Sequence, residues 1–211
     1  SGKDLSRCSI FFPTCEDTEF ETKIDTFTQV SKGSEKVDIL WVIDNSGSMK
    51  DNQVHLSENT DKFINKFLNA SEGIPDFNMA VTTTDARVGY GAGKLFQGKV
   101  LTREEALKNR TLFLKQFSDI VRVGTRGSGS EVCLAAIEMS LGGFAEEFGK
   151  RYKRPENHIK FFREDAILVV NILSDEHDSS ERIFGKSPAK LLEEIKALKK
   201  GQRVVINSIV N

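Results

Sequence analysis

Oxygen-bearing side chains follow an apolar run near the start of the chain, in the order Asp44-Asn45-Ser46-Gly47-Ser48. The preceding residues, 37–43, form a short run rich in β-branched side chains, which is typical of a strand buried on both faces. Asp44, Ser46 and Ser48 together offer one carboxylate and two hydroxyl groups. These hard donors suit Mg²⁺, Ca²⁺ or Mn²⁺ rather than zinc. Because neutral hydroxyl groups leave the cation electron-poor, the motif predicts a site that seeks one more anionic ligand.

A second apolar run ends in a similar way. Residues 166–173, Ala-Ile-Leu-Val-Val-Asn-Ile-Leu, are followed by Ser174-Asp175-Glu176-His177-Asp178. Between the two runs, the glycine-rich polar residues 124–131 precede a helical pattern. This loop lacks the Gly-Lys-Ser or Gly-Lys-Thr sequence of a P-loop, so phosphate binding of that type is not supported.

Together these stretches resemble the von Willebrand factor A family, and the sequence from Asp38 to Met49 is similar to its bacterial members. Asp44-x-Ser46-x-Ser48 resembles the metal-ion-dependent adhesion site of that family. The resemblance implies that a hydroxyl group of the 124–131 loop also contacts the metal. Thr125 fits by identity and Ser128 by its distance to the following helix, and both alternatives stay open. Asp175 would be the second metal-associated aspartate, although Glu176 stands where many members have glycine.

Strands and helices alternate around these motifs. The patterns predict strands at residues 37–43, 77–84, 166–173 and 204–210, a short edge strand within 94–101, and helices near 56–68, 102–121, 132–148 and 187–201. Thr102 with Glu105 resembles a capping box, and Ser187-Pro188 a helix start. With the family resemblance, this alternation implies an α/β fold. We expect a doubly wound, mostly parallel central sheet with one antiparallel edge strand and helices on both faces, and ligands at the carboxyl ends of its strands.

Length and composition set further bounds. A chain of 211 residues is long enough for one domain with a sizeable core, which we place at residues 37–211, after an N-terminal extension at residues 1–36. The family normally continues beyond the last predicted strand, so we expect a C-terminal end that is either truncated or divergent. The net charge of −1 argues against nucleic-acid binding, and no apolar stretch is long enough for a membrane span. Cys8 and Cys15 are either bridged or two free thiols. Cys133 is expected to be a buried free thiol.

The resemblance implies a divalent-cation-dependent adhesion or protein-interaction module rather than an enzyme. Its cation would be Mg²⁺, or Mn²⁺ or Ca²⁺ in its place, and would capture an Asp or Glu carboxylate of a protein partner. The expected location is extracytoplasmic, meaning periplasmic, cell-surface or secreted.

Two other classes compete with this interpretation. One is a magnesium-dependent phosphoryl-transfer hydrolase with Asp44 as nucleophile, but a second aspartate in the first loop and a phosphate-binding lysine are not evident. The other is a metal-free structural scaffold, which the complete set of hydroxyl and carboxylate groups disfavours. A serine hydrolase with His177 as base is weaker still, because no Gly-x-Ser-x-Gly surrounds Ser46.

Overall fold

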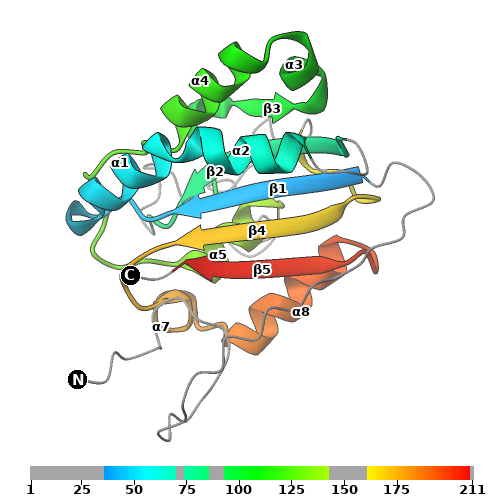
Figure 1. Cartoon of the computed structure of the whole chain (residues 1–211). Helices are drawn as coiled ribbons and strands as arrows, with labels where there is room; N and C mark the ends of the chain where they lie inside the picture. Colours follow the sequence, from blue (N-terminus) through cyan, green and yellow to red (C-terminus); the bar gives the residue numbers. More distant parts are fainter. Residues whose placement is uncertain (1–35, 70–73, 86–92, 143–160, 210–211) are drawn as a thin grey trace, which may run out of the picture.

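The computed structural model describes residues 36–69, 74–85, 93–142 and 161–209 (Figure 1). The predicted extension at residues 1–36 therefore lies almost entirely outside the described residues, and so does the question of a Cys8–Cys15 bridge. Within the described part of the chain, no helix is long and apolar enough to cross a membrane.

A five-stranded sheet forms the centre of the molecule, in the order β3-β2-β1-β4-β5 (Figure 1). Its strands are β1 (Lys36–Ile43), β2 (Asp76–Thr83), β3 (Val100–Thr102), β4 (Ile167–Leu173) and β5 (Val204–Ile209). Strand β3 pairs antiparallel with β2, and the other neighbours pair in parallel. This confirms the predicted doubly wound, mostly parallel sheet with one antiparallel edge strand.

Helices cover both faces of the sheet, as predicted. One face is covered by four helices: α1 (Lys50–Glu58), α2 (Thr60–Leu68), α3 (Arg103–Lys108) and α4 (Arg110–Ile120). They pack with strand side chains such as Trp41. The other face is covered by α5 (Cys133–Ser140) and α8 (Pro188–Leu198), which pack with the strand side chains that point the opposite way, including Leu40. Strand β1 has buried side chains pointing to both layers because successive residues face opposite sides. The short helix α7 (Ser180–Phe184) and two 3₁₀ turns, η1 (Gly47–Met49) and η2 (Phe96–Gly98), complete the described elements.

Local capping signals agree with the structure. The Thr102 hydroxyl accepts a hydrogen bond from Glu105 N, and the Glu105 carboxylate accepts one from Thr102 N, which completes the predicted capping box. Ser187 Oγ accepts a hydrogen bond from Lys190 N at the start of α8, where Pro188 occupies the first turn.

Two predicted helices are each divided at an asparagine. The expected helix at residues 102–121 is α3 and α4, because Asn109 adopts an extended backbone (φ −154°, ψ 90°) and its side chain accepts a hydrogen bond from Leu112 N. On the same face of the sheet, Asn59 separates α1 from α2. The predicted edge strand within 94–101 is also shorter than expected, because η2 occupies residues 96–98 and β3 begins only at Val100.

A buried charge network lies near the amino end of β1. Asp38 is completely buried and accepts hydrogen bonds from Arg163 Nε (2.9 Å) and Lys199 Nζ (3.1 Å). Burial raises the pKa of Asp38, and the two cationic partners oppose that effect. The network joins β1 to the residues before β4 and to the end of α8.

Cys133, at the start of α5, is disulfide-bonded. The prediction of a free thiol is therefore wrong. It rested on the position of Cys133 in a helical pattern, which carries no information about a bonding partner elsewhere in the chain.

Candidate functional site

The sheet reverses its winding between β1 and β4. The chain passes from β1 to β2 and β3 on one side, and then returns to add β4 and β5 on the other. The carboxyl ends of β1 and β4 are therefore neighbours, and Asp44 N donates a hydrogen bond of 2.9 Å to Leu173 O there. In doubly wound sheets this reversal point is the usual place for a ligand.

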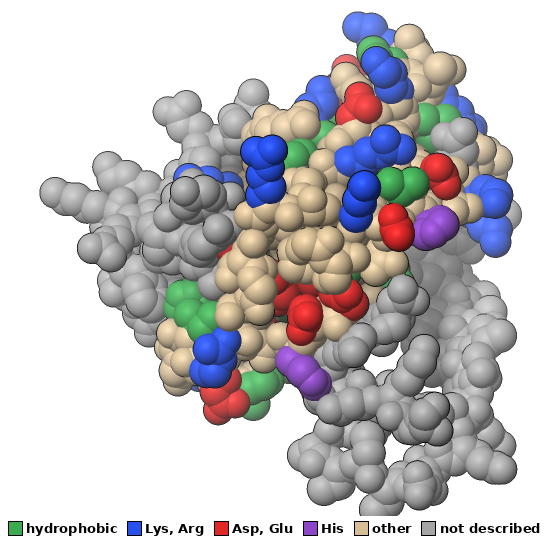
Figure 2. Space-filling model, turned by 90° about the vertical axis from the view of Figure 1, so that its left-hand side faces the viewer, with side chains coloured by type: hydrophobic (Ala, Val, Ile, Leu, Met, Phe, Trp, Pro, Cys, Tyr) green, Lys and Arg blue, Asp and Glu red, His purple; other side chains and the backbone are tan. Residues whose placement is uncertain are grey.

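Four of the six predicted site residues meet at this point. Ser46 Oγ and Ser48 Oγ share a hydrogen bond of 3.1 Å, and Ser48 Oγ donates one of 3.1 Å to Asp175 Oδ1. Asp44 accepts hydrogen bonds of 2.7 Å from Ser46 N and from Ser174 Oγ, one on each carboxylate oxygen. Figure 2, which faces the carboxyl ends of the parallel strands, shows acidic side chains gathered near the middle of this surface.

The Asp44 carboxylate is fully buried, whereas Ser48 is exposed and Asp175 half-buried. Burial raises the pKa of Asp44, the hydrogen bonds from Ser174 and Ser46 oppose the rise, and the nearby Asp175 carboxylate adds to it. A divalent cation between the two carboxylates would remove their mutual repulsion. The arrangement therefore has both the donor atoms and the charge for a cation that is open to solvent on one side.

Gln53 holds the first loop against the glycine-rich loop. Its side-chain Nε2 donates hydrogen bonds to Asp44 O (2.9 Å) and Gly124 O (2.8 Å), and its Oε1 accepts one from Gly124 N (3.1 Å). The sequence analysis missed this residue, because it predicted the helix to begin only near residue 56, whereas α1 begins at Lys50.

Gly127 makes the second contact between these loops. Its N–H donates a hydrogen bond of 2.6 Å to Asn45 O, and a Cβ atom at this position would lie 2.2 Å from Asn45 Oδ1. Only glycine permits so close an approach of the two backbones. The glycine-rich loop therefore lies against the first loop at Asn45.

Thr125 and Ser128 both lie half-buried in that loop. Ser128 Oγ accepts a hydrogen bond from Ser130 N. Within the described residues, no hydrogen bond joins either hydroxyl group to Asp44 or Asp175, so the assignment of one of them to the metal stays a prediction.

Further carboxylates lie behind the site. Glu131, two residues before the start of α5, forms backbone bridges with Asp85 and with Asp178. Burial raises the pKa of Glu131 to about 8, the hydrogen bond from the Thr84 hydroxyl opposes the rise, and Asp44 and Asp85 add to it.

Asp178 has a structural role. Its carboxylate accepts hydrogen bonds from Ser180 Oγ (2.6 Å) and Ser180 N (3.1 Å), and also bonds with backbone groups in the first turn of α5, at Cys133 and Leu134. It therefore caps that helix.

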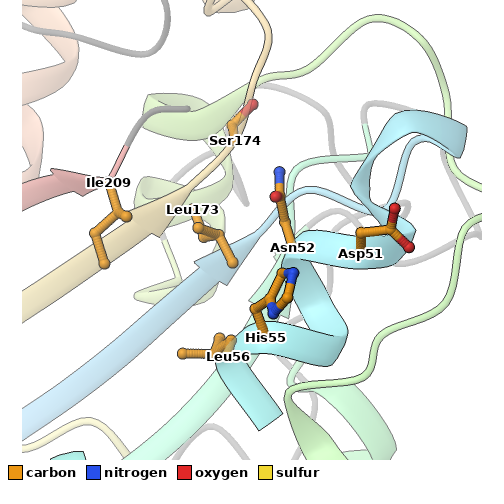
Figure 3. A pocket seen from close by; sticks show the side chains of 7 residues that line it. All are labelled: Asp51, Asn52, His55, Leu56, Leu173, Ser174 and Ile209. Atoms are coloured by element: carbon orange, nitrogen blue, oxygen red, sulfur yellow. The ribbon is translucent and has the colours of Figure 1, made fainter. Parts of the chain in front are cut away.

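A pocket of about 560 Å³ opens beside the site (Figure 3). Residues of α1 line one side of it, and residues at the carboxyl ends of β4 and β5 line the other. Ser174, which donates to Asp44, belongs to this lining. The full set is Asp51, Asn52, His55, Leu56, Leu173, Ser174 and Ile209.

Among the described residues, no group of three or more His, Cys, Asp or Glu side chains is arranged to hold a metal ion. The candidate set differs from such a group, because it combines two carboxylates with hydroxyl groups. Hydroxyl-rich sites of this kind suit hard cations that retain several waters.

No protein-family model matches the sequence, and no curated protein matches it. Solved structures do match. Proximal thread matrix protein 1 from the mussel byssus has 14% identity and a TM-score of 0.42, and the match covers 84% of this chain and 38% of that one. The pilus adhesin SpaC from Lactobacillus rhamnosus GG, in its open conformation, has 14% identity and a TM-score of 0.38, with 67% of this chain and 15% of that one covered.

A von Willebrand factor type A structure from Catenulispora acidiphila has 12% identity and a TM-score of 0.36, with 84% of this chain and 39% of that one covered. The chain thus spans less than half the length of each of these three proteins. The last of these three is itself described as a von Willebrand factor type A structure. At these identities the likeness concerns the fold alone.

Proposed function

We propose that this chain is a von Willebrand factor A-type module that binds a divalent cation and uses it to capture an acidic side chain of a protein partner. The observation that carries the proposal is the link from Ser46 through Ser48 to Asp175, made by two hydrogen bonds of 3.1 Å. It brings the donor atoms of two distant segments to one point beside Asp44. These same oxygens are the atoms that a hard cation would use.

The donor set favours Mg²⁺, with Mn²⁺ or Ca²⁺ able to take its place. Ser46, Ser48 and one hydroxyl group from Thr125 or Ser128 would be its neutral ligands. Asp44 and Asp175 would hold it directly or through waters. Because Mg²⁺ is six-coordinate and keeps several waters, an exchangeable position would remain for a partner's Asp or Glu carboxylate.

Two further features support an interaction module outside the cytoplasm. The pocket beside Ser174 offers room for side chains that flank the captured carboxylate. The disulfide at Cys133 suits an oxidising compartment such as the periplasm, the cell surface or the exterior. A catalytic role is not part of the proposal, because serines stand where phosphoryl transfer would want a second aspartate.

Calorimetric titration of Mg²⁺, Mn²⁺ and Ca²⁺ into the chain tests the cation site. Binding should be lost in Asp44→Ala and retained in Asp165→Ala, a matched control whose carboxylate is exposed and pairs with Lys36. If the native chain binds no cation, with or without acetate as a carboxylate ligand, the proposal is wrong. Capture of candidate partners with and without chelator then tests the adhesive role.

A further inference from the structure

Helix α5 begins with a buried cysteine whose sulfur is already bonded. The Cys133 side chain is completely buried in the core on the α5 face of the sheet, and it is part of a disulfide. The chain contains three cysteines, and the other two are Cys8 and Cys15. A disulfide within this chain therefore joins Cys133 to one of those two residues, both of which precede the described part of the chain.

The start of α5 is a fixed point in the fold. The Asp178 carboxylate bonds with the backbone of Cys133. Directly before Cys133, Val132 N donates a hydrogen bond of 2.9 Å to Thr84 O. These contacts join the first turn of α5 to the loops that follow β4 and β2. A disulfide at Cys133 is therefore anchored at the edge of the sheet that carries the candidate site.

The chain before β1 is long enough to make this bond. Strand β1 begins at Lys36, at the opposite edge of the sheet from Cys133. The eight residues of β1 span roughly 26 Å. Residues 16–35 alone reach roughly 60–70 Å when extended, so the distance along the sheet excludes neither Cys8 nor Cys15 as the partner.

We infer that Cys133 is bonded to Cys8 or Cys15, so that the N-terminal extension is covalently tied to the start of α5. This pairing excludes a Cys8–Cys15 bridge, because each sulfur atom forms one disulfide. Its formation joins the two Sγ atoms, releases two protons and passes two electrons to a disulfide oxidant, such as oxidised glutathione, which is reduced to two thiols. The tie involves no cation, and its test is therefore independent of the proposed function.

Such a tie stabilises the domain through the unfolded chain. It closes a loop of more than a hundred residues, which contains β1, β2 and β3. A crosslink across so long a loop removes conformational entropy from the unfolded chain, whereas in the folded protein it restricts only the segment before Lys36. The extension is then a covalent part of the domain rather than a separate arm.

Peptide mapping without reduction tests the pairing directly. After free thiols are alkylated at low pH, trypsin releases residues 8–23, with both N-terminal cysteines, and residues 127–150, with Cys133. We expect these two peptides as one disulfide-linked species that separates on reduction. Chymotrypsin, which cuts between Phe11 and Phe12, then shows which cysteine is bonded. An alkylated Cys133 beside an internally bridged 8–23 peptide would overturn the inference.

Thermal unfolding gives a second readout. Because the crosslink closes so long a loop, a reductant should lower the Tm of the native chain by about 10 °C. Cys133→Ala and the double variant Cys8→Ser with Cys15→Ser should unfold near the reduced native chain and should not respond to the reductant. Serine at the cysteine that the peptide map leaves unpaired is the matched control, which should behave as the native chain does. A native Tm that the reductant leaves unchanged would also overturn the tie.

Discussion

Ser48 Oγ donates a hydrogen bond of 3.1 Å to Asp175 Oδ1, although the two residues lie 127 positions apart in the chain. One stands in the loop after β1 and the other in the loop after β4. The bond therefore joins the two halves of the sheet at the point where its winding reverses. It also holds the candidate cation ligands close together through contacts of the protein itself, which reduces the cost of ordering them when a cation binds.

Replacing Gln53 should loosen the candidate site. Gln53→Leu removes three hydrogen bonds and leaves backbone groups of Asp44 and Gly124 without their partner, so we expect a loss of about 2–3 kcal/mol in the free energy of unfolding. Cation affinity should fall with it. Urea denaturation and calorimetry measure the two effects. Gln202→Leu, at an exposed position, is the control, and an equal loss in both variants would contradict the role of Gln53.

Two glycines of one loop should respond differently to alanine. At Gly127 a Cβ atom would lie 2.2 Å from Asn45 Oδ1 and 2.6 Å from Asn45 O, whereas at Gly129 it would meet nothing within 4 Å. We expect Gly127→Ala to lower the free energy of unfolding by about 1–3 kcal/mol and to weaken cation binding. Gly129→Ala should change neither. Thermal unfolding with and without Mg²⁺ measures both variants, and identical behaviour would show that the close approach at Gly127 is unimportant.

The buried network at Asp38 should contribute to stability and not to cation binding. Asp38→Ala leaves Lys199 as a fully buried charge without its carboxylate partner, and we expect a loss of about 3–5 kcal/mol. Lys36→Ala, which breaks the exposed pair with Asp165, should have no measurable effect. Guanidinium denaturation gives the stabilities. A loss of cation affinity in folded Asp38→Ala would contradict the separation of the network from the site.

Glu138 should make stability depend on pH. Burial raises its pKa from 4.5 to about 7, the nearby Glu194 adds to the rise and Lys186 opposes it. The folded protein therefore holds this proton more tightly than the unfolded chain does. Its stabilising contribution is complete below about pH 4.5 and is lost as the pH rises through about 7. Chemical denaturation in chelator should show that the free energy of unfolding of the native chain falls, relative to that of Glu138→Gln, by on the order of 2–3 kcal/mol as the pH rises across this range. Parallel pH profiles of the two proteins would contradict the prediction.

The sequence predicted the parts of the site that are local. Asp44, Ser46 and Ser48 share one loop, and the apolar runs before Asp44 and Asp175 identify two buried strands, so their meeting follows from the winding of the sheet. Gln53 could not be predicted in this way. Its burial arises because the first turns of α1 lie over the loop at Gly124, a contact that leaves no mark in the periodicity of the helix.

Glu131 and the two helix breaks were beyond the sequence for a different reason. Glu131 ends a polar loop, where the sequence favours a solvated side chain, but in the structure it is buried and forms backbone bridges with Asp85 and Asp178. Asn59 and Asn109 stand within patterns that continue on both sides with helical spacing. Asparagine favours helix caps over helix interiors, but the preference is too small to reveal a break against such a pattern.

The order of the strands has a consequence for the growing chain. Strand β1 is complete early in synthesis, but its neighbour β4 follows more than a hundred residues later, and Asp175 lies beyond β4. A nascent chain that has folded β1, β2 and β3 therefore has Asp44, Ser46 and Ser48, but not yet the candidate ligands that follow β3. Cation binding would then report that β4 has been added beside β1, and would favour molecules that have made this pairing over those that have not.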